Sequence, residues 1–114
     1  MPETLLPLSE YQGMWLFALF DLPVTSKEHK KHYVEFRRIL IKQGFMMMQY
    51  SVYARYCASE EYGGILKKKL KAGLPPDGEV RLLMVTDRQF GKMECFSGKK
   101  SYKPEGAPEQ MMLF

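Results

Sequence analysis

Apolar positions fall along this chain in two periods, one typical of strands and one typical of helices. The almost wholly apolar run at residues 14–20 predicts a strand buried on both faces, and Asp21-Leu22-Pro23 ends it. The other apolar runs are short and rich in aromatic and β-branched residues, which also favours strands. These strands are predicted within residues 45–57, with a turn near residues 49–51, at residues 79–87 and, as a short fifth strand, at residues 93–96.

Two helices are predicted between these strands. Thr25 as N-cap and Glu28 three residues later form a capping box, so the first helix runs to about residue 43 and stops at Gly44. Its core stripe is formed by Tyr33, Phe36, Ile39 and Leu40. Ser59 can cap a second helix that ends near residue 72, before a loop at residues 73–78.

The resulting order is β-α-β-β-α-β with an extra C-terminal strand, which predicts an α+β, ferredoxin-like sandwich. The crossovers place both helices on one face of the sheet. The other face then needs a cover, and a second copy in a homodimer is the simplest one. We divide the chain into an N-terminal extension (residues 1–13), the ferredoxin-like domain (14–98) and a C-terminal linker with an apolar tail (99–114).

The chain has 114 residues and a net charge of +4, which permits a polyanionic partner without requiring one. Its two cysteines, Cys57 and Cys95, form no C-x-x-C motif, and we interpret them as reduced thiols of a cytoplasmic protein. There is no secretory signal, and the longest apolar run is about a third of what a bilayer requires.

The cations are clustered, which favours contact with nucleic-acid phosphates, although each cluster taken alone also suits a solvated face that serves solubility. The first-helix cluster is Lys27, Lys30, Lys31, Arg37, Arg38 and Lys42. The second-helix cluster is Lys67, Lys68, Lys69 and Lys71. Four further lysines follow the last predicted strands: Lys92, Lys99, Lys100 and Lys103.

Asp21 is the leading candidate for chemistry because it ends an apolar strand, where the backbone is rigid. Two such carboxylates meeting across a dimer axis could hold Mg²⁺ and activate water against a phosphodiester. The alternative is that Asp21 merely caps the turn before Pro23. Asp87 is interpreted as a turn residue, and His29 and His32 as surface histidines without a third metal ligand.

Two further features admit more than one interpretation. Tyr50, Tyr53 and Tyr56 could stack on bases, but the preferred interpretation places them in the core and the dimer interface. The apolar tail is either a terminus without structure or a partner-docking segment that adds to a sheet edge. It comprises Gln110, Met111, Met112, Leu113 and Phe114.

Several of these segments together resemble the CRISPR-associated protein 2 family, the small core subunit of CRISPR spacer acquisition. The resemblance covers residues 14–114, and its most specific parts are the Gln49-Tyr50-Ser51-Val52-Tyr53 and Val85-Thr86-Asp87-Arg88-Gln89-Phe90-Gly91 motifs. Phe20-Asp21-Leu22-Pro23, Phe36-Arg37-Arg38, Gly44-Phe45 and the terminal Leu113-Phe114 also match. Residues 1–13 depart from the family pattern, as does Phe20 where a tyrosine is frequent.

The resemblance implies a homodimer held between two dimers of the CRISPR integrase, CRISPR-associated protein 1, and bound to a double-stranded DNA prespacer. It also implies Mg²⁺-dependent cleavage of RNA or DNA, with Asp21 as the metal-linked residue. Three hypotheses follow: a DNA-binding scaffold with phosphodiesterase activity, a stand-alone, toxin-like endoribonuclease, and a ligand-sensing regulatory domain.

Overall fold

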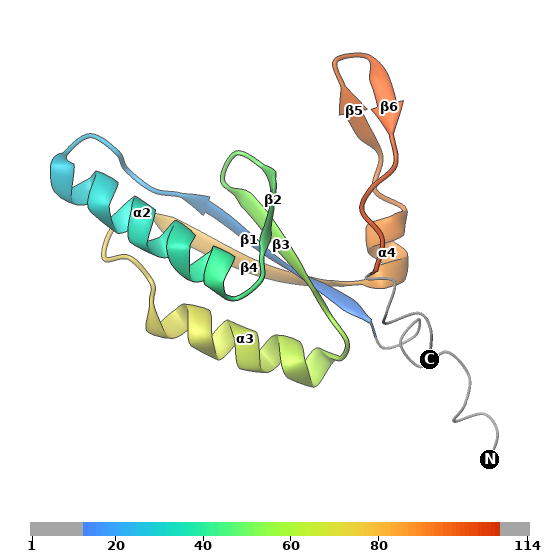
Figure 1. Ribbon diagram of the computed structural model, residues 1–114, viewed down its shortest axis with the longest axis horizontal. Coiled ribbons are helices and arrows are strands. Elements are labelled where there is room, and N and C mark those ends of the chain that lie inside the picture. The colour runs from blue at the N-terminus through green and yellow to red at the C-terminus, as the bar shows by residue number, and fades with distance from the viewer. Residues whose placement is uncertain (1–12, 108–114) are drawn as a thin grey trace.

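The fold is described here from a computed structural model, in which residues 13–107 are placed (Figure 1). The predicted extension and the apolar tail, Gln110 to Phe114, lie outside these residues except for Gly13. The elements are β1 (Met14–Asp21), α2 (Lys27–Lys42), β2 (Met46–Gln49), β3 (Val52–Cys57), α3 (Glu60–Ala72), β4 (Glu79–Thr86), α4 (Asp87–Gly91), β5 (Cys95–Ser97) and β6 (Lys100–Tyr102).

The main sheet has four strands in the order β2-β3-β1-β4, and every pair in it is antiparallel. Both long helices, α2 and α3, lie on one face of this sheet (Figure 1). The predicted ferredoxin-like α+β fold is therefore confirmed. Within residues 13–107, no helix is long and apolar enough to cross a lipid bilayer.

β1 is fully buried only on the side that meets the helices, so the predicted burial on both faces is confirmed in part: on the other side Phe17 and Leu19 are half-buried and Asp21 is exposed. Leu16, Ala18 and Phe20 pack against the helices in a core with Phe36, Leu40, Leu66 and Leu70. Since side chains alternate along a strand, Trp15 lies on the opposite face, in a second cluster with Ala54, Tyr56 and Phe90. We call this opposite side of the sheet the open face.

The first helix begins one residue later than predicted. Ser26, not Thr25, is the N-cap: its side chain accepts a hydrogen bond of 3.1 Å from the backbone N–H of His29. The predicted Thr25–Glu28 capping box is therefore wrong. From the sequence alone, the hydroxyl of either Thr25 or Ser26 could cap this helix. The C-terminal stop is confirmed: Gly44 has φ +85, and the N–H of Phe45 donates to the carbonyl of Leu40.

The connection after β4 is a short helix, α4, which was not predicted from the sequence. Thr86 is its N-cap and forms a capping box with Gln89. α4 places Phe90 on Trp15, with ring centroids 4.0 Å apart and planes within 9° of parallel. The chain therefore covers the Trp15 end of the open face itself, while Leu83, opposite Phe17 on that face, stays 52% exposed.

The last strands form a separate two-stranded sheet. The predicted fifth strand lies at Cys95–Ser97 and pairs with Lys100–Tyr102 through a turn in which Gly98 has φ +63. The prediction missed β6, which falls within the segment interpreted as an exposed linker. This β5–β6 hairpin stands away from the main sheet (Figure 1).

Candidate functional site

Asp21 is the last residue of β1 and pairs across the sheet with Glu79, the first residue of β4. The alternation along β1 puts Asp21 on the open face, away from the helices. Its side chain borders a shallow, open hollow of about 210 Å³, lined by Leu19, Phe20, Asp21, Glu79 and Arg81. Arg81 lies 4.0 Å from Glu79, so this exposed strand end carries two carboxylates and a guanidinium.

The Asp21 end of β1 suits Mg²⁺ only in a site where waters and substrate phosphates supply the other ligands. Among the residues that the structure describes, no three His, Cys, Asp or Glu side chains gather closely enough to enclose a metal ion. Mg²⁺ is commonly held by one or two carboxylates, several waters and the phosphates of a substrate. Asp21, with Glu79 beside it, can supply such carboxylate ligands, whereas a closed protein cage is not formed.

Close backbone packing fixes the position of Asp21. Gly78, in the loop before β4, has φ +89, and a Cβ atom there would lie 2.6 Å from the carbonyl oxygen of Asp21. On the other side, the N–H of Phe20 donates to the carbonyl of Ser51 over 3.1 Å. The strand end is therefore held between the β4 entry loop and the β2–β3 turn.

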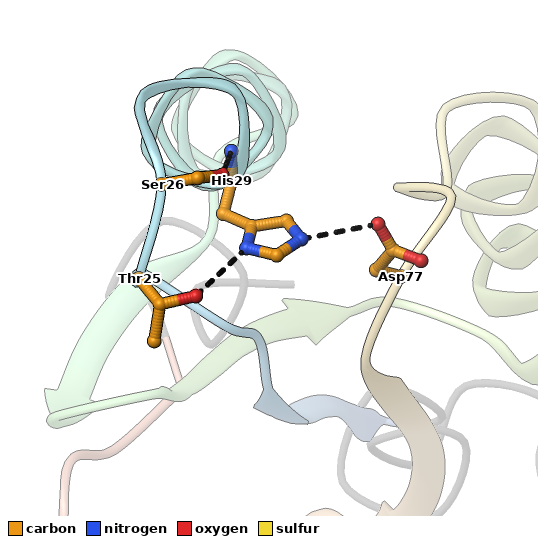
Figure 2. A network of polar contacts seen from close by, with 4 residues as sticks. All are labelled: Thr25, Ser26, His29 and Asp77. Atoms are coloured by element: carbon orange, nitrogen blue, oxygen red, sulfur yellow. Dashed lines mark hydrogen bonds and ion pairs between the residues drawn. The ribbon is translucent and has the colours of Figure 1, made fainter.

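A polar clip ties the start of α2 to the same loop (Figure 2). Nε2 of His29 lies 3.3 Å from Oδ2 of Asp77, and Nδ1 of His29 lies 3.2 Å from Oγ1 of Thr25. His29 is thus a partly exposed surface histidine, as expected, with a 29% exposed side chain, and it also bridges α2 and this loop. The clip connects two segments that border the Asp21 strand end.

Four cations of α2 share one side of the helix. Lys27, Lys31, Arg38 and Lys42 follow each other at spacings of four, seven and four residues, and all are exposed. Because an α-helix rises 1.5 Å per residue, this stripe extends over about 22 Å. The buried residues Phe36 and Leu40 lie on the opposite side, so the stripe faces away from the core.

The predicted second-helix cluster lies in the same helical layer, with Lys68, Lys69 and Lys71 exposed and Lys67 half-buried near the buried Leu66 and Leu70. Both cationic clusters therefore lie on the helix side of the sheet. Asp21 projects from the other side, so one protomer does not bring its predicted metal residue and its predicted phosphate-binding residues together.

The remaining cations of the α2 cluster, Lys30 and Arg37, lie on a different flank of the helix. They are three residues before and four residues after Tyr33, and so occupy the same side as that ring. Nε of Arg37 donates a hydrogen bond of 2.8 Å to Oη of Tyr53 in β3, which holds the guanidinium against the sheet.

The three predicted tyrosines have different environments. Tyr53 and Tyr56 are 2% and 8% exposed, so the expected core position is confirmed for both. Burial raises the pKa of Tyr56, and the nearby charge of Asp87 raises it further. Tyr50 lies outside the core: it is 74% exposed, in the turn between β2 and β3.

Tyr33 supports the exposed Tyr50 ring. The two ring centroids are 6.4 Å apart, and the ring planes differ by 23°. The pKa of Tyr33 is raised, first by burial and then by a side-chain hydrogen bond to Tyr50. Tyr50 is therefore exposed but held in position.

Both thiols are free, as predicted. Burial raises the pKa of Cys57, which opposes thiolate formation. The residues that sequence reasoning missed are Glu79 and Arg81. They lie two residues apart at the start of a strand, and only the β1–β4 register shows that they share a face with Asp21.

The fold and the Asp21 carboxylate at the end of β1 together define a small ferredoxin-like protein with cationic helices. Residues 14–93 match the family model described as CRISPR associated protein Cas2. The chain is 46% identical over 101 residues to the CRISPR-associated endoribonuclease Cas2 of Parvibaculum lavamentivorans, covering 89% of this chain and 100% of that protein. It is 38% identical over 107 residues to the protein of the same name from Flavobacterium psychrophilum, covering 94% and 93%. The chain belongs to the CRISPR-associated Cas2 family.

Proposed function

We propose that the protein is a double-stranded-DNA-binding scaffold in CRISPR spacer acquisition, acting as a homodimer in the prokaryotic cytoplasm beside CRISPR integrase dimers. The observation that carries this proposal is the stripe of Lys27, Lys31, Arg38 and Lys42 along α2. Regularly spaced cations that face away from the core suit contact with successive phosphates and carry no base-reading pattern.

The open face supports the homodimer. It keeps Leu83 52% exposed beside Phe17, while α4 covers only the Trp15 end. A second copy packed on the uncovered part would bury this apolar surface and double the positive charge that a duplex meets.

Salt-dependent binding of a blunt duplex tests the scaffold. With about six phosphate contacts, affinity should fall by about 10³-fold between 50 and 200 mM salt. A triple variant should bind DNA more weakly, and its affinity should depend less on salt, by the equivalent of about three phosphate contacts. It carries Lys31→Ala, Arg38→Ala and Lys42→Ala. The matched control removes three other exposed lysines, with Lys99→Ala, Lys100→Ala and Lys103→Ala. An equal loss of DNA affinity in both triple variants would show that the stripe acts only through net charge, and would contradict the proposal.

A metal-dependent endoribonuclease is the second candidate, favoured by the exposed Asp21 and by the name of the relatives. When bound, Mg²⁺ would lower the pKa of a water and neutralise charge developing on a phosphodiester. Asp21 would hold the ion, Glu79 would add a carboxylate, and Arg81 would contact a phosphate oxygen.

Cleavage assays separate the two functions. Asp21→Asn should abolish Mg²⁺-dependent RNA cleavage while leaving duplex affinity within twofold. Ser97→Ala, at an exposed position of the hairpin, is the control. Cleavage that survives Asp21→Asn at the wild-type rate would rule out this strand end as the active site.

Integrase docking is tested by co-purification of the full chain with the integrase on a splayed duplex. A variant that lacks the tail should no longer co-purify with the integrase but should still bind DNA. The deleted residues are Gln110, Met111, Met112, Leu113 and Phe114. Retention of the integrase would remove the tail from the proposal.

A further inference from the structure

Tyr50 is an exposed aromatic ring that the backbone-binding scaffold does not use. It is the most exposed large apolar or aromatic side chain among the described residues, at 74%, whereas Tyr53 and Tyr56 of the same segment are buried. A tyrosine left in water and also fixed in place suits a flat ligand that covers the ring.

The geometry points to a nucleobase-stacking site at Tyr50 that takes an unpaired nucleotide of a single-stranded DNA or RNA segment. Every base offers a flat aromatic face, and stacking on tyrosine needs no particular sequence. Bases inside a duplex already stack on their neighbours, so the ligand must be an unpaired strand, such as an overhang. The inference rests on the proposed nucleic-acid binding and adds a base-contacting residue to it.

The ring is held before any ligand arrives. Tyr33 packs against it with centroids 6.4 Å apart and an angle of 23° between the planes. The following residue, Ser51, is fixed at φ 64 and its carbonyl accepts the Phe20 N–H over 3.1 Å. A ring that is already ordered loses little conformational entropy on binding, which favours stacking.

Cations flank Tyr33, the ring on which Tyr50 packs, where a strand's phosphates would pass. Lys30 and Arg37 lie on the same side of α2 as Tyr33, one on each side of it along the helix. The hydrogen bond from Nε of Arg37 to Oη of Tyr53, 2.8 Å long, fixes that guanidinium beside the tyrosines. An aromatic ring between cations is the combination used to bind single strands.

The site also adjoins the strand end of Asp21. In the antiparallel register, Leu19 faces Val52, and the Phe20–Ser51 hydrogen bond continues the pairing towards the turn. The next residues along the two strands are Asp21 and Tyr50. The backbone at Tyr50 therefore lies beside the end of β1, although the Tyr50 ring packs against Tyr33 of α2 while the Asp21 carboxylate projects from the open face.

The test uses the full chain with two probes: a blunt DNA duplex, and the same duplex with a single-stranded overhang containing 2-aminopurine. Tyr50→Ala should weaken overhang-duplex binding by about 5- to 100-fold and leave blunt-duplex binding within twofold. Tyr50→Leu, which keeps apolar bulk without a ring, should behave alike, and Tyr50→Phe should bind as wild type. Tyr102→Ala removes another exposed tyrosine, on the hairpin, and should have no effect.

The quenching of 2-aminopurine reports stacking directly. Wild type and Tyr50→Phe should quench it, while Tyr50→Ala and Tyr50→Leu should not. Unchanged overhang affinity and quenching in Tyr50→Leu would overturn the stacking site, as would a loss of dimer or integrase binding with overhang affinity intact. A wild type that binds the overhang but not the blunt duplex would instead contradict the duplex scaffold. DNA and RNA overhangs measured in parallel identify the strand that the site prefers.

Discussion

Nε1 of Trp15 donates a hydrogen bond of 2.7 Å to Oδ1 of Asp87, across 72 residues of sequence. The same aspartate begins α4, and its backbone N–H donates to the carbonyl of Gly13 over 2.9 Å. With Phe90 stacked on the indole, these contacts fasten α4 to the open face.

Asp87→Ala should therefore destabilise the fold. It leaves the buried Trp15 N–H without its acceptor, which costs about 1–3 kcal/mol of unfolding free energy. Urea unfolding followed by Trp15 fluorescence measures this. Arg88→Ala, at the exposed neighbouring position, should stay within about 0.5 kcal/mol of wild type. Equal stability of the two variants would contradict the role given to the Trp15–Asp87 bond.

Gly78 and Gly64 should respond to alanine in opposite directions. Gly78 has φ +89 and its added Cβ would meet the carbonyl oxygen of Asp21 at 2.6 Å, so Gly78→Ala should cost more than about 1 kcal/mol. Gly64 lies in α3 with no atom within 4 Å of an added Cβ, so Gly64→Ala should stabilise by about 0.5–1 kcal/mol. Thermal unfolding of both variants checks the signs, and a neutral Gly78→Ala would show that the loop can move off β1.

The His29–Asp77 clip should contribute little free energy. Asp77 is 58% exposed, and pairs of this kind are worth about 0–1 kcal/mol. A double-mutant cycle with His29→Ala and Asp77→Ala measures the coupling, which should shrink further at 1 M salt. Coupling well above 1 kcal/mol would mean that the clip holds the strand end more firmly than its exposure implies.

Tyr56 should make stability fall at alkaline pH. Its pKa in the folded protein is raised above the ordinary value of 10.0, so the folded state keeps the proton more tightly than the unfolded chain. This contribution is complete below pH 10.0 and is lost as pH rises through the folded-state pKa. The unfolding free energy of Tyr56→Phe should consequently decline less steeply above pH 10 than that of wild type. Parallel curves for the two proteins would contradict this.

The two thiols should react at different rates. Cys57 is 0% exposed and its pKa is raised by burial, while Cys95 is half-buried on the hairpin. A thiol-specific reagent should therefore label Cys95 first and Cys57 only after unfolding. Cys95→Ser should remove the fast phase, and a fast phase that persists would show that Cys57 is accessible.

The sequence predicted the main fold because its signals there are local and strong. The continuous apolar stretch of β1 and the Gly44 stop each admit one interpretation. Thr25 and Ser26 both offer a capping hydroxyl, and only the backbone geometry selects Ser26. α4 was missed although Thr86 and Gln89 carry a capping-box pattern, since five residues give no helical period to detect.

The candidate site was less predictable because it depends on register between distant strands. Asp21 could be singled out from its place at a strand end, but Glu79 and Arg81 join it only through the β1–β4 pairing. The regular spacing of lysines and arginines along α2 could be predicted directly from the sequence. That the cationic layer and Asp21 lie on opposite sides of the sheet follows only from knowing which face of β1 meets the helices.

The β5–β6 hairpin, with Phe96 and Tyr102 59% and 54% exposed, pairs only within itself in its sheet. An isolated pair of strands is marginally stable in water, so these strands can open without the four-stranded sheet opening. Their amide protons should exchange with deuterium long before those of β1. The protein thus combines a core that unfolds cooperatively with a β5–β6 hairpin that can open and close separately from it.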